Sequence, residues 1–157
     1  MAVHRISRHF DTSDATAEAA AALGRMLTAG DTVLLSGPVG AGKTHFARHL
    51  IRALLITPED IPSPTFTLVQ TYDTRLGPVW HADLYRIATV DEIEELGLGE
   101  AFETAICLVE WPDRLGELRP DDALDIWLGD GGSEDSRTLT AHWDDPRWTD
   151  KMRAWAA

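Results

Sequence analysis

Cysteine, lysine and long hydrophobic runs are all scarce in this sequence. Of its 157 residues one is a cysteine, Cys107, so no disulfide can form within the chain, and a reducing compartment is expected. No stretch approaches the roughly 18 consecutive apolar residues of a membrane-spanning helix, and the N-terminus lacks the apolar core of a signal peptide. We therefore expect a cytoplasmic protein that does not enter a membrane.

Basic residues are few relative to acidic ones. Lysine and arginine number 14 against 26 aspartates and glutamates, which gives a formal net charge of −12. Because affinity for nucleic acids depends on clustered basic side chains, this balance excludes a broad surface for a phosphate backbone. Any nucleic acid involved should be held mainly by a partner. The length predicts one domain, residues 1–157, large enough for its own hydrophobic core.

One of the two lysines lies in a specific motif. Residues 37–44 read G-P-V-G-A-G-K-T, a complete match to the phosphate-binding loop G-x-x-x-x-G-K-[ST], which arises by chance in roughly one chain of this length in 200. An apolar, β-branched run at 31–36 precedes the motif, and apolar residues at helical spacing follow it at 45–55. This is the strand–loop–helix setting that the motif needs, so the chain is predicted to bind a nucleoside triphosphate.

Each fixed position of the loop has a physical task. Three glycines let the backbone approach a phosphate closely, and its N–H groups then form an anion nest in front of the following helix. Lys43 should reach the β- and γ-phosphates, and the Thr44 hydroxyl should bind Mg²⁺. The predicted nucleotide-binding residues of the loop are Gly37, Pro38, Val39, Gly40, Ala41, Gly42, Lys43 and Thr44.

Two acidic residues are predicted to be catalytic. Glu110 closes the apolar run 106–109, the pattern of a Walker B strand, and Asp83 lies in the segment W-H-A-D-L-Y-R. A carboxylate at the end of such a strand can bind Mg²⁺ and orient the attacking water, so Glu110 and Thr44 are the predicted metal ligands. The alternative for each acid is a plain carboxylate at a strand end. Trp111 is also assigned to the nucleotide site, where it could stack on the base or on a switch segment, although a core tryptophan is the commoner outcome.

A switch-like segment is predicted after the proline-rich connector 57–64. Ser63, Thr65 and Thr67 bring hydroxyl groups that could sense the γ-phosphate and its Mg²⁺. The alternative is an ordinary strand start of high β-propensity. His81 could be a core histidine or part of such a switch.

The expected nucleotide is ATP. The guanine-reading pattern [NT]-K-x-D requires an aspartate two positions after a lysine, and neither Lys43 nor Lys151 satisfies it. ATP and Mg²⁺ are therefore the predicted cofactors.

The periodicity of the chain predicts a three-layer α/β domain of the P-loop NTPase type. Its mixed sheet should have a parallel centre and antiparallel edge strands. Strands are expected at 4–10, 31–36, 65–72, 79–85, 106–109, 124–128 and 138–142, and helices at 15–28, 45–55, 91–102 and 144–156. The strands at 65–72 and 79–85 are close enough in the chain to pair antiparallel.

Five motifs in order resemble those of the TsaE (YjeE) family of small bacterial ATPases. They are G-x-x-G-A-G-K-T, S-P-T-F-T-L-V-x-x-Y, H-A-D-L-Y-R, E-E-L-G-L and V-E-W-P-x-R, and together they cover roughly residues 30–114. The resemblance is loose in the C-terminal third. Two departures are Pro38-Val39, where the family commonly has an acidic residue and leucine, and His45, which replaces a common second threonine.

The resemblance implies a function in threonylcarbamoyl modification of tRNA. Such proteins bind ATP and Mg²⁺, hydrolyse ATP weakly alone, and dock onto a complex of TsaB and TsaD. TsaD transfers the threonylcarbamoyl group to the adenosine next to the anticodon in ANN-decoding tRNAs, so tRNA is a partner only through the complex, and ATP turnover resets the complex between cycles. Carried over by motif, Asp83 and Glu110 are the acids needed for activity, Ser63 to Thr67 is the switch-like segment, and Trp111 adjoins the site.

Two other functions remain open from the residues. A small-molecule or nucleoside kinase shares the loop, Mg²⁺ and sheet, but usually has an arginine-rich lid that is not visible in this sequence. A nucleotide-dependent interaction module would need ATP binding more than its hydrolysis.

Overall fold

The computed structural model of the chain describes residues 4–64 and 67–156. Its strands are β1 (His4–Phe10), β2 (Thr32–Ser36), β3 (Val69–Thr74), β4 (Gly77–Asp83), β5 (Ile106–Glu110), β6 (Leu124–Asp130) and β7 (Arg137–Trp143). Its α-helices are α1 (Ser13–Gly24), α2 (Lys43–Arg52), α3 (Val90–Glu95), α4 (Leu98–Thr104) and α5 (Thr149–Ala156). Two 3₁₀ segments, η1 (Pro112–Leu118) and η2 (Pro146–Trp148), complete the described elements.

The seven strands form one mixed sheet in the order β1-β7-β6-β2-β5-β4-β3. The central strands β6, β2, β5 and β4 run parallel to one another. At one side β7 pairs antiparallel with β6 and with β1, and at the other side β3 pairs antiparallel with β4. The apolar run 106–109 of β5 is fully buried, as expected for a parallel strand covered on both faces. The predicted fold class, with a parallel centre and antiparallel edges, is confirmed.

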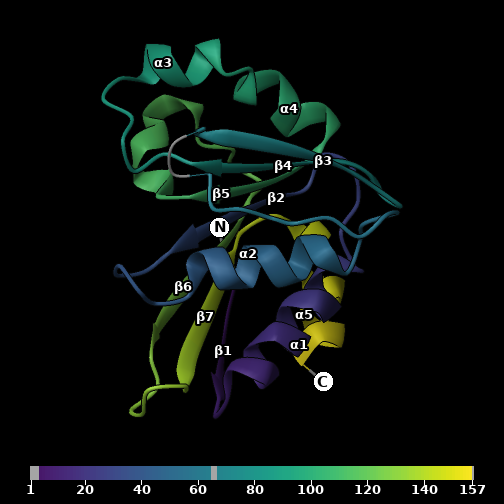
Figure 1. The fold of residues 1–157 in the computed structure, drawn as a ribbon, viewed down its shortest axis with the longest axis vertical. Helices are drawn as coiled ribbons and strands as arrows, with labels where there is room; N and C mark the ends of the chain where they lie inside the picture. The colour runs from purple at the N-terminus through teal and green to yellow at the C-terminus, as the bar shows by residue number, and fades with distance from the viewer. Residues whose placement is uncertain (1–3, 65–66, 157) are drawn as a thin grey trace.

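Helices cover both faces of the sheet and give the three layers (Figure 1). Helices α1, α2 and α5 pack on one face, where the core includes Phe46, Leu50 and Ile51 of α2. Helices α3 and α4 pack on the other face, around Ile93, Leu98 and neighbouring apolar side chains. The phosphate loop therefore connects a buried central strand to a helix whose inner face is anchored in the core.

Two predicted elements differ from the structure. Of the strand expected at 65–72, residues 65 and 66 lie outside the described residues. The described strand begins at Val69, because Leu68 adopts a left-handed conformation (φ 68°) and its N–H donates to the carbonyl of Pro64 at 2.7 Å. The helix expected at 91–102 is divided into α3 and α4 at Gly97, whose φ of 85° no helix interior permits.

Other predicted boundaries shift by a few residues. Helix α1 ends at Gly24 rather than at 28, and β4 ends at Asp83 rather than at 85. The last helix begins at Thr149, after the 3₁₀ turn that starts at Pro146. Within the described ranges, no helix is both long and apolar enough to cross a membrane.

Candidate functional site

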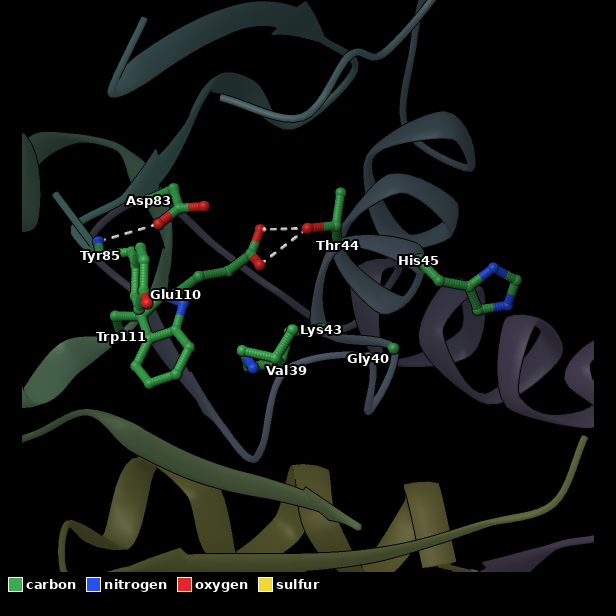
Figure 2. Close-up of a pocket in the computed structure, with 10 residues that line it drawn as sticks. Val39, Gly40, Lys43, Thr44, His45, Asp83, Tyr85, Glu110 and Trp111 are labelled. Atoms are coloured by element: carbon green, nitrogen blue, oxygen red, sulfur yellow. Dashed lines mark hydrogen bonds between the residues drawn. The ribbon is translucent and has the colours of Figure 1, made fainter. Parts of the chain in front are cut away.

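The carboxyl ends of β2, β4 and β5 meet at one edge of the sheet, because these neighbouring strands run parallel. The chain leaves β2 into the phosphate loop, β4 ends at Asp83 and β5 ends at Glu110, and these two acids are paired in register. Ligands bind at this edge in open α/β sheets. A pocket of about 440 Å³ opens there (Figure 2), lined by Val39, Gly40, Gly42, Lys43, Thr44, His45, Asp83, Tyr85, Glu110 and Trp111.

Glycine is required in the loop for two different reasons. At Gly37 (φ +144°) a Cβ would lie 2.2 Å from the carbonyl oxygen of Leu128, which is backbone and cannot give way. Gly42 precedes α2 with a φ of +97°, and having no side chain it offers no oxygen to cap the helix. The N–H groups of the first turn of α2 are thus left for another acceptor, and a helix N-terminus favours an anion.

Lys43 lies along the loop rather than in solvent. Its Nζ donates hydrogen bonds to the carbonyl oxygens of Gly37 at 2.7 Å and Pro38 at 3.0 Å, and it lies 4.5 Å from the ring centre of Trp111. Burial lowers the pKa of Lys43 from its usual value, while the nearby carboxylates of Glu110 and Asp83 act in the opposite direction. The ammonium group is therefore held at the mouth of the loop, between backbone oxygens and two acids.

Glu110 joins three elements through hydrogen bonds. The Thr44 hydroxyl, at the start of α2, lies 2.8 Å from Glu110 Oε1 and 3.1 Å from Oε2. His81 Nε2, from β4, lies 2.7 Å from Oε2. Glu110 is 2% exposed, so its charge depends on these partners.

The donor set of Thr44 and Glu110 fits Mg²⁺. This ion prefers oxygen ligands and is commonly held by one or two carboxylates together with phosphate oxygens and water. A hydroxyl and a carboxylate oxygen that lie 2.8 Å apart beside a phosphate loop are suitable protein ligands for it.

Aromatic side chains border the pocket beside Asp83. The Asp83 carboxylate accepts the backbone N–H of Tyr85 at 2.9 Å, and the Tyr85 ring lies 4.8 Å from the Trp111 ring. Trp111 adopts a left-handed conformation (φ 59°), which turns the chain directly after Glu110. Its ring contacts both Tyr85 and Lys43, so Trp111 lines the pocket while its other side packs against the core beneath α3 and α4.

The predicted switch-like residues do not line this pocket in the described part of the chain. Ser63 and Thr67 are exposed, and the Thr67 hydroxyl accepts a hydrogen bond from Gln70 at 2.9 Å. Thr65 lies outside the described residues. The switch-like role of the segment stays a prediction.

Tyr85 and His45 line the pocket but were not predicted to do so, and the sequence left the role of His81 open. Tyr85 lies in the same H-A-D-L-Y-R motif as Asp83, which was the available signal. His81 is two positions before Asp83, so the two side chains share one face of β4. His45 follows the loop, and its ring points away from Glu110 (Figure 2).

Comparisons with known proteins identify the family that the chain resembles. The family model described as "Threonylcarbamoyl adenosine biosynthesis protein TsaE" matches residues 10–139. The chain is 37% identical over 118 residues to "tRNA threonylcarbamoyladenosine biosynthesis protein TsaE" of Rickettsia bellii (strain RML369-C), covering 75% of this chain and 82% of the relative. It is 40% identical over 112 residues to the protein of the same name from Bacillus subtilis (strain 168), covering 71% and 68%.

A solved structure has the same fold. The crystal structure of Bacillus subtilis YdiB superimposes with a TM-score of 0.80 at 26% identity, and the match covers 99% of this chain and 97% of that one. The likeness therefore extends through the C-terminal third, where the sequence motifs are weak.

Proposed function

Because this chain belongs to the TsaE family, we propose that it is a P-loop ATPase of tRNA threonylcarbamoyladenosine biosynthesis. It binds ATP with Mg²⁺ and acts on a complex of TsaB and TsaD, so that this complex can modify the adenosine next to the anticodon of ANN-decoding tRNAs repeatedly. The observation that carries the proposal is the contact between Thr44 at the phosphate loop and Glu110 at the end of β5, with Lys43 beside them.

The loop and Lys43 would bind the phosphates. The first-turn N–H groups of α2 would donate hydrogen bonds to a phosphate. Lys43 would exchange its hydrogen bonds to the carbonyls of Gly37 and Pro38 for hydrogen bonds to phosphate oxygens. Thr44 and Glu110 would hold Mg²⁺, which neutralises charge on the β- and γ-phosphates when bound. Trp111, packed against Lys43, would limit the access of water to this side of the pocket.

The two acids would act on the attacking water. Asp83 and Glu110 are adjacent across β4 and β5, and the Asp83 carboxylate is fixed by the N–H of Tyr85. Such carboxylates orient a water molecule and accept its proton. Lys43 is the only lysine or arginine in the described lining of the pocket. Arginine often stabilises the transferring phosphoryl group, so a partner residue would accelerate a reaction that is slow in the isolated chain.

The decisive experiment measures threonylcarbamoyl-tRNA formed by purified TsaB and TsaD under multiple-turnover conditions, with and without this protein and ATP. Stimulation by the wild-type chain and its loss in Lys43→Ala are expected, because the variant lacks the cation of the loop. Arg153→Ala, which removes an exposed cation from α5, serves as the control and should stimulate normally. No stimulation by the wild-type chain, with all partners active, would reject the function and favour a kinase with a separate phosphate acceptor.

A further inference from the structure

His81 is a buried residue for which the proposed reaction has no assigned task. It lies in β4, opposite Leu108 of β5, and its side chain is fully buried. One ring nitrogen, Nε2, lies 2.7 Å from Glu110 Oε2. The other, Nδ1, is buried and has no hydrogen-bond partner among residues 4–64 and 67–156. The single polar contact of the ring is therefore directed at the carboxylate of the site.

The direction of this hydrogen bond follows from its acceptor. An ionised carboxylate can only accept, so Nε2 must carry the hydrogen of this bond. The Thr44 hydroxyl donates to the same carboxylate from the opposite element, α2. Glu110 is thus held from both sides, by a strand neighbour and by the phosphate-loop helix.

We infer that His81 is a positioning residue for the metal site: its Nε2–H fixes the Glu110 carboxylate so that Thr44 and Glu110 present their oxygens together to Mg²⁺. The inference rests on the proposed function, since it concerns the same site. A glutamate side chain has three rotatable bonds, and ordering it costs free energy unless a partner holds it in place. Partners that orient a metal ligand commonly change metal affinity by about 10–100-fold when they are removed.

A purely structural role makes a different prediction. If His81 only satisfied a buried carboxylate, its loss would lower the stability of the fold without changing the response to Mg²⁺. A positioning role instead predicts a selective loss of Mg²⁺ affinity, with nucleotide binding in the absence of the metal unchanged. The two roles are separated by the Mg²⁺ concentration needed to reach half of the metal-dependent gain in nucleotide affinity.

Two amides of different length provide a matched pair of variants. The side-chain nitrogen of glutamine can occupy the place of His Nε2, whereas that of asparagine reaches only the place of Nδ1. His81→Gln should keep a donor to Glu110 and stay within about threefold of the wild-type Mg²⁺ response, while His81→Asn should need about 10–100-fold more Mg²⁺. The probe is a fluorescent ATP analogue, titrated in EDTA and at increasing Mg²⁺, with the unfolding free energy measured for each variant.

The outcomes separate this inference from the proposed function. A wild-type chain that binds the analogue with a clear Mg²⁺ response, and equal responses in both variants, would overturn the role of His81 and leave the function intact. A wild-type chain that fails to bind the analogue would contradict both.

A measurement on the wild-type protein tests the geometry if His81→Asn does not fold. In nitrogen-15 NMR spectra of histidine-labelled protein, the His81 ring should carry its hydrogen on Nε2. A ring with hydrogen on Nδ1 and none on Nε2 could not donate to Glu110, and that result would overturn the proposal.

Discussion

Glu110 is the side chain on which the chemistry of the proposed site depends most directly. It lies at the end of β5 and is hydrogen-bonded to Thr44 of α2 and His81 of β4. Replacing one of its oxygens by an amide nitrogen keeps the shape of the side chain and removes its charge. The resulting variant separates the binding of ATP from its hydrolysis.

We expect Glu110→Gln to retain nucleotide binding in EDTA but to need more Mg²⁺ for the metal-dependent gain in affinity, because a charged metal ligand is lost. ATP turnover should fall by about 10²–10⁴-fold, the usual contribution of a group that handles the proton of the attacking water. The loop and Lys43, which bind the phosphates, are unchanged by this substitution. The measurement is steady-state ATP hydrolysis with the TsaB–TsaD complex present, alongside the dissociation constant of the fluorescent analogue. Full support of tRNA modification by a variant without turnover would favour a nucleotide-dependent interaction module over an ATPase.

The residues of the loop and Glu110 could be predicted from sequence because their signals are local. Lys43 and Thr44 stand at fixed positions of a contiguous motif, and Glu110 ends a continuous apolar run. The bond between His81 and Glu110 joins residues 29 positions apart. It depends on β4 pairing with β5 in one register, which neither strand's own pattern specifies.

Among the helices, the division between α3 and α4 offers the sharpest test. Gly97 adopts a left-handed conformation (φ 85°) and its added Cβ would make only ordinary contact, 3.5 Å from the Trp80 ring. Gly99, two residues later, lies within α4, and an added Cβ there would meet no atom within 4 Å. The same substitution should therefore have opposite effects at the two positions.

Gly97→Ala should lower the unfolding free energy by about 1 kcal/mol, because alanine is strained in the left-handed region. Gly99→Ala should raise it by about 0.5 kcal/mol, since alanine has the higher helix propensity and restricts the unfolded chain. Urea unfolding of both variants measures the two values. Destabilisation by both, of equal size, would show that the left-handed turn at position 97 is not the cause.

The apolar, β-branched runs predicted the central strands, whereas two turns, at Leu68 and at Gly97, could not be predicted from the sequence. The residues before β3 have high β-propensity, yet Leu68 takes a left-handed conformation held by bonds to Pro64 and from Asp83 N–H. At Gly97 the apolar spacing on either side was compatible with one continuous helix. In both cases a single backbone angle, which side-chain periodicity does not report, decides where the element starts or ends.

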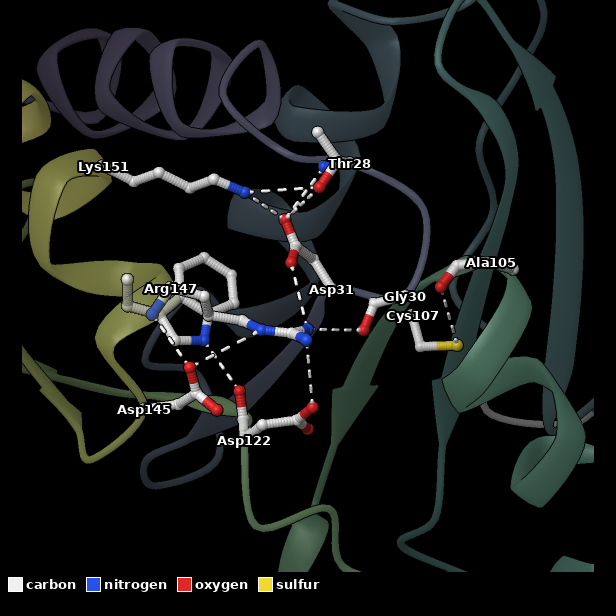
Figure 3. A network of polar contacts seen from close by, with 10 residues as sticks. Thr28, Gly30, Asp31, Ala105, Cys107, Asp122, Asp145, Arg147 and Lys151 are labelled. Carbon is white, nitrogen blue, oxygen red and sulfur yellow. Dashed lines mark hydrogen bonds and ion pairs between the residues drawn. The ribbon is translucent and has the colours of Figure 1, made fainter.

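Across the whole molecule, β2 connects the site to a second polar cluster at its other end. Asp31, directly before β2, is 2% exposed and accepts bonds from Lys151 at 2.6 Å and from the N–H of Thr28 at 2.9 Å (Figure 3). Arg147 lies 3.5 Å from its other oxygen. The C-terminal segment is thereby tied to the start of the strand that leads into the phosphate loop.

This long-range tie could not be predicted, because Asp31 and Lys151 are 120 positions apart. The spacing of Trp148, Met152 and Trp155 suggests one apolar face on a last helix, and all three are buried, with Trp148 in η2 and the other two in α5. Their apolar pattern requires a hydrophobic surface but does not identify it. The packing of α5 beside α1 determines that Lys151 pairs with Asp31.

Lys151→Met tests whether this tie stabilises the fold. The substitution keeps most of the apolar stem, and it leaves the buried Asp31 with Arg147 and with the N–H and hydroxyl of Thr28 as partners. Breaking a fully buried ion pair costs about 3–5 kcal/mol, and the remaining partners reduce the expected loss to about 1–3 kcal/mol. Denaturant unfolding of the two proteins gives the value.

The matched control removes another cation from the same helix. Arg153 pairs with Asp150 at 3.1 Å, but both side chains are exposed, so Arg153→Ala should change the unfolding free energy by less than about 0.5 kcal/mol. The loss in Lys151→Met should also largely persist in high salt, because Asp31 is buried, Lys151 is mostly covered, and such a pair is screened less than an exposed one. Equal effects of the two substitutions would mean that Asp31 is adequately satisfied by Arg147 and Thr28 alone.

The affinity for the ATP analogue should be unchanged in both variants, since Lys151 contacts the start of β2 and the phosphate loop follows the end of β2.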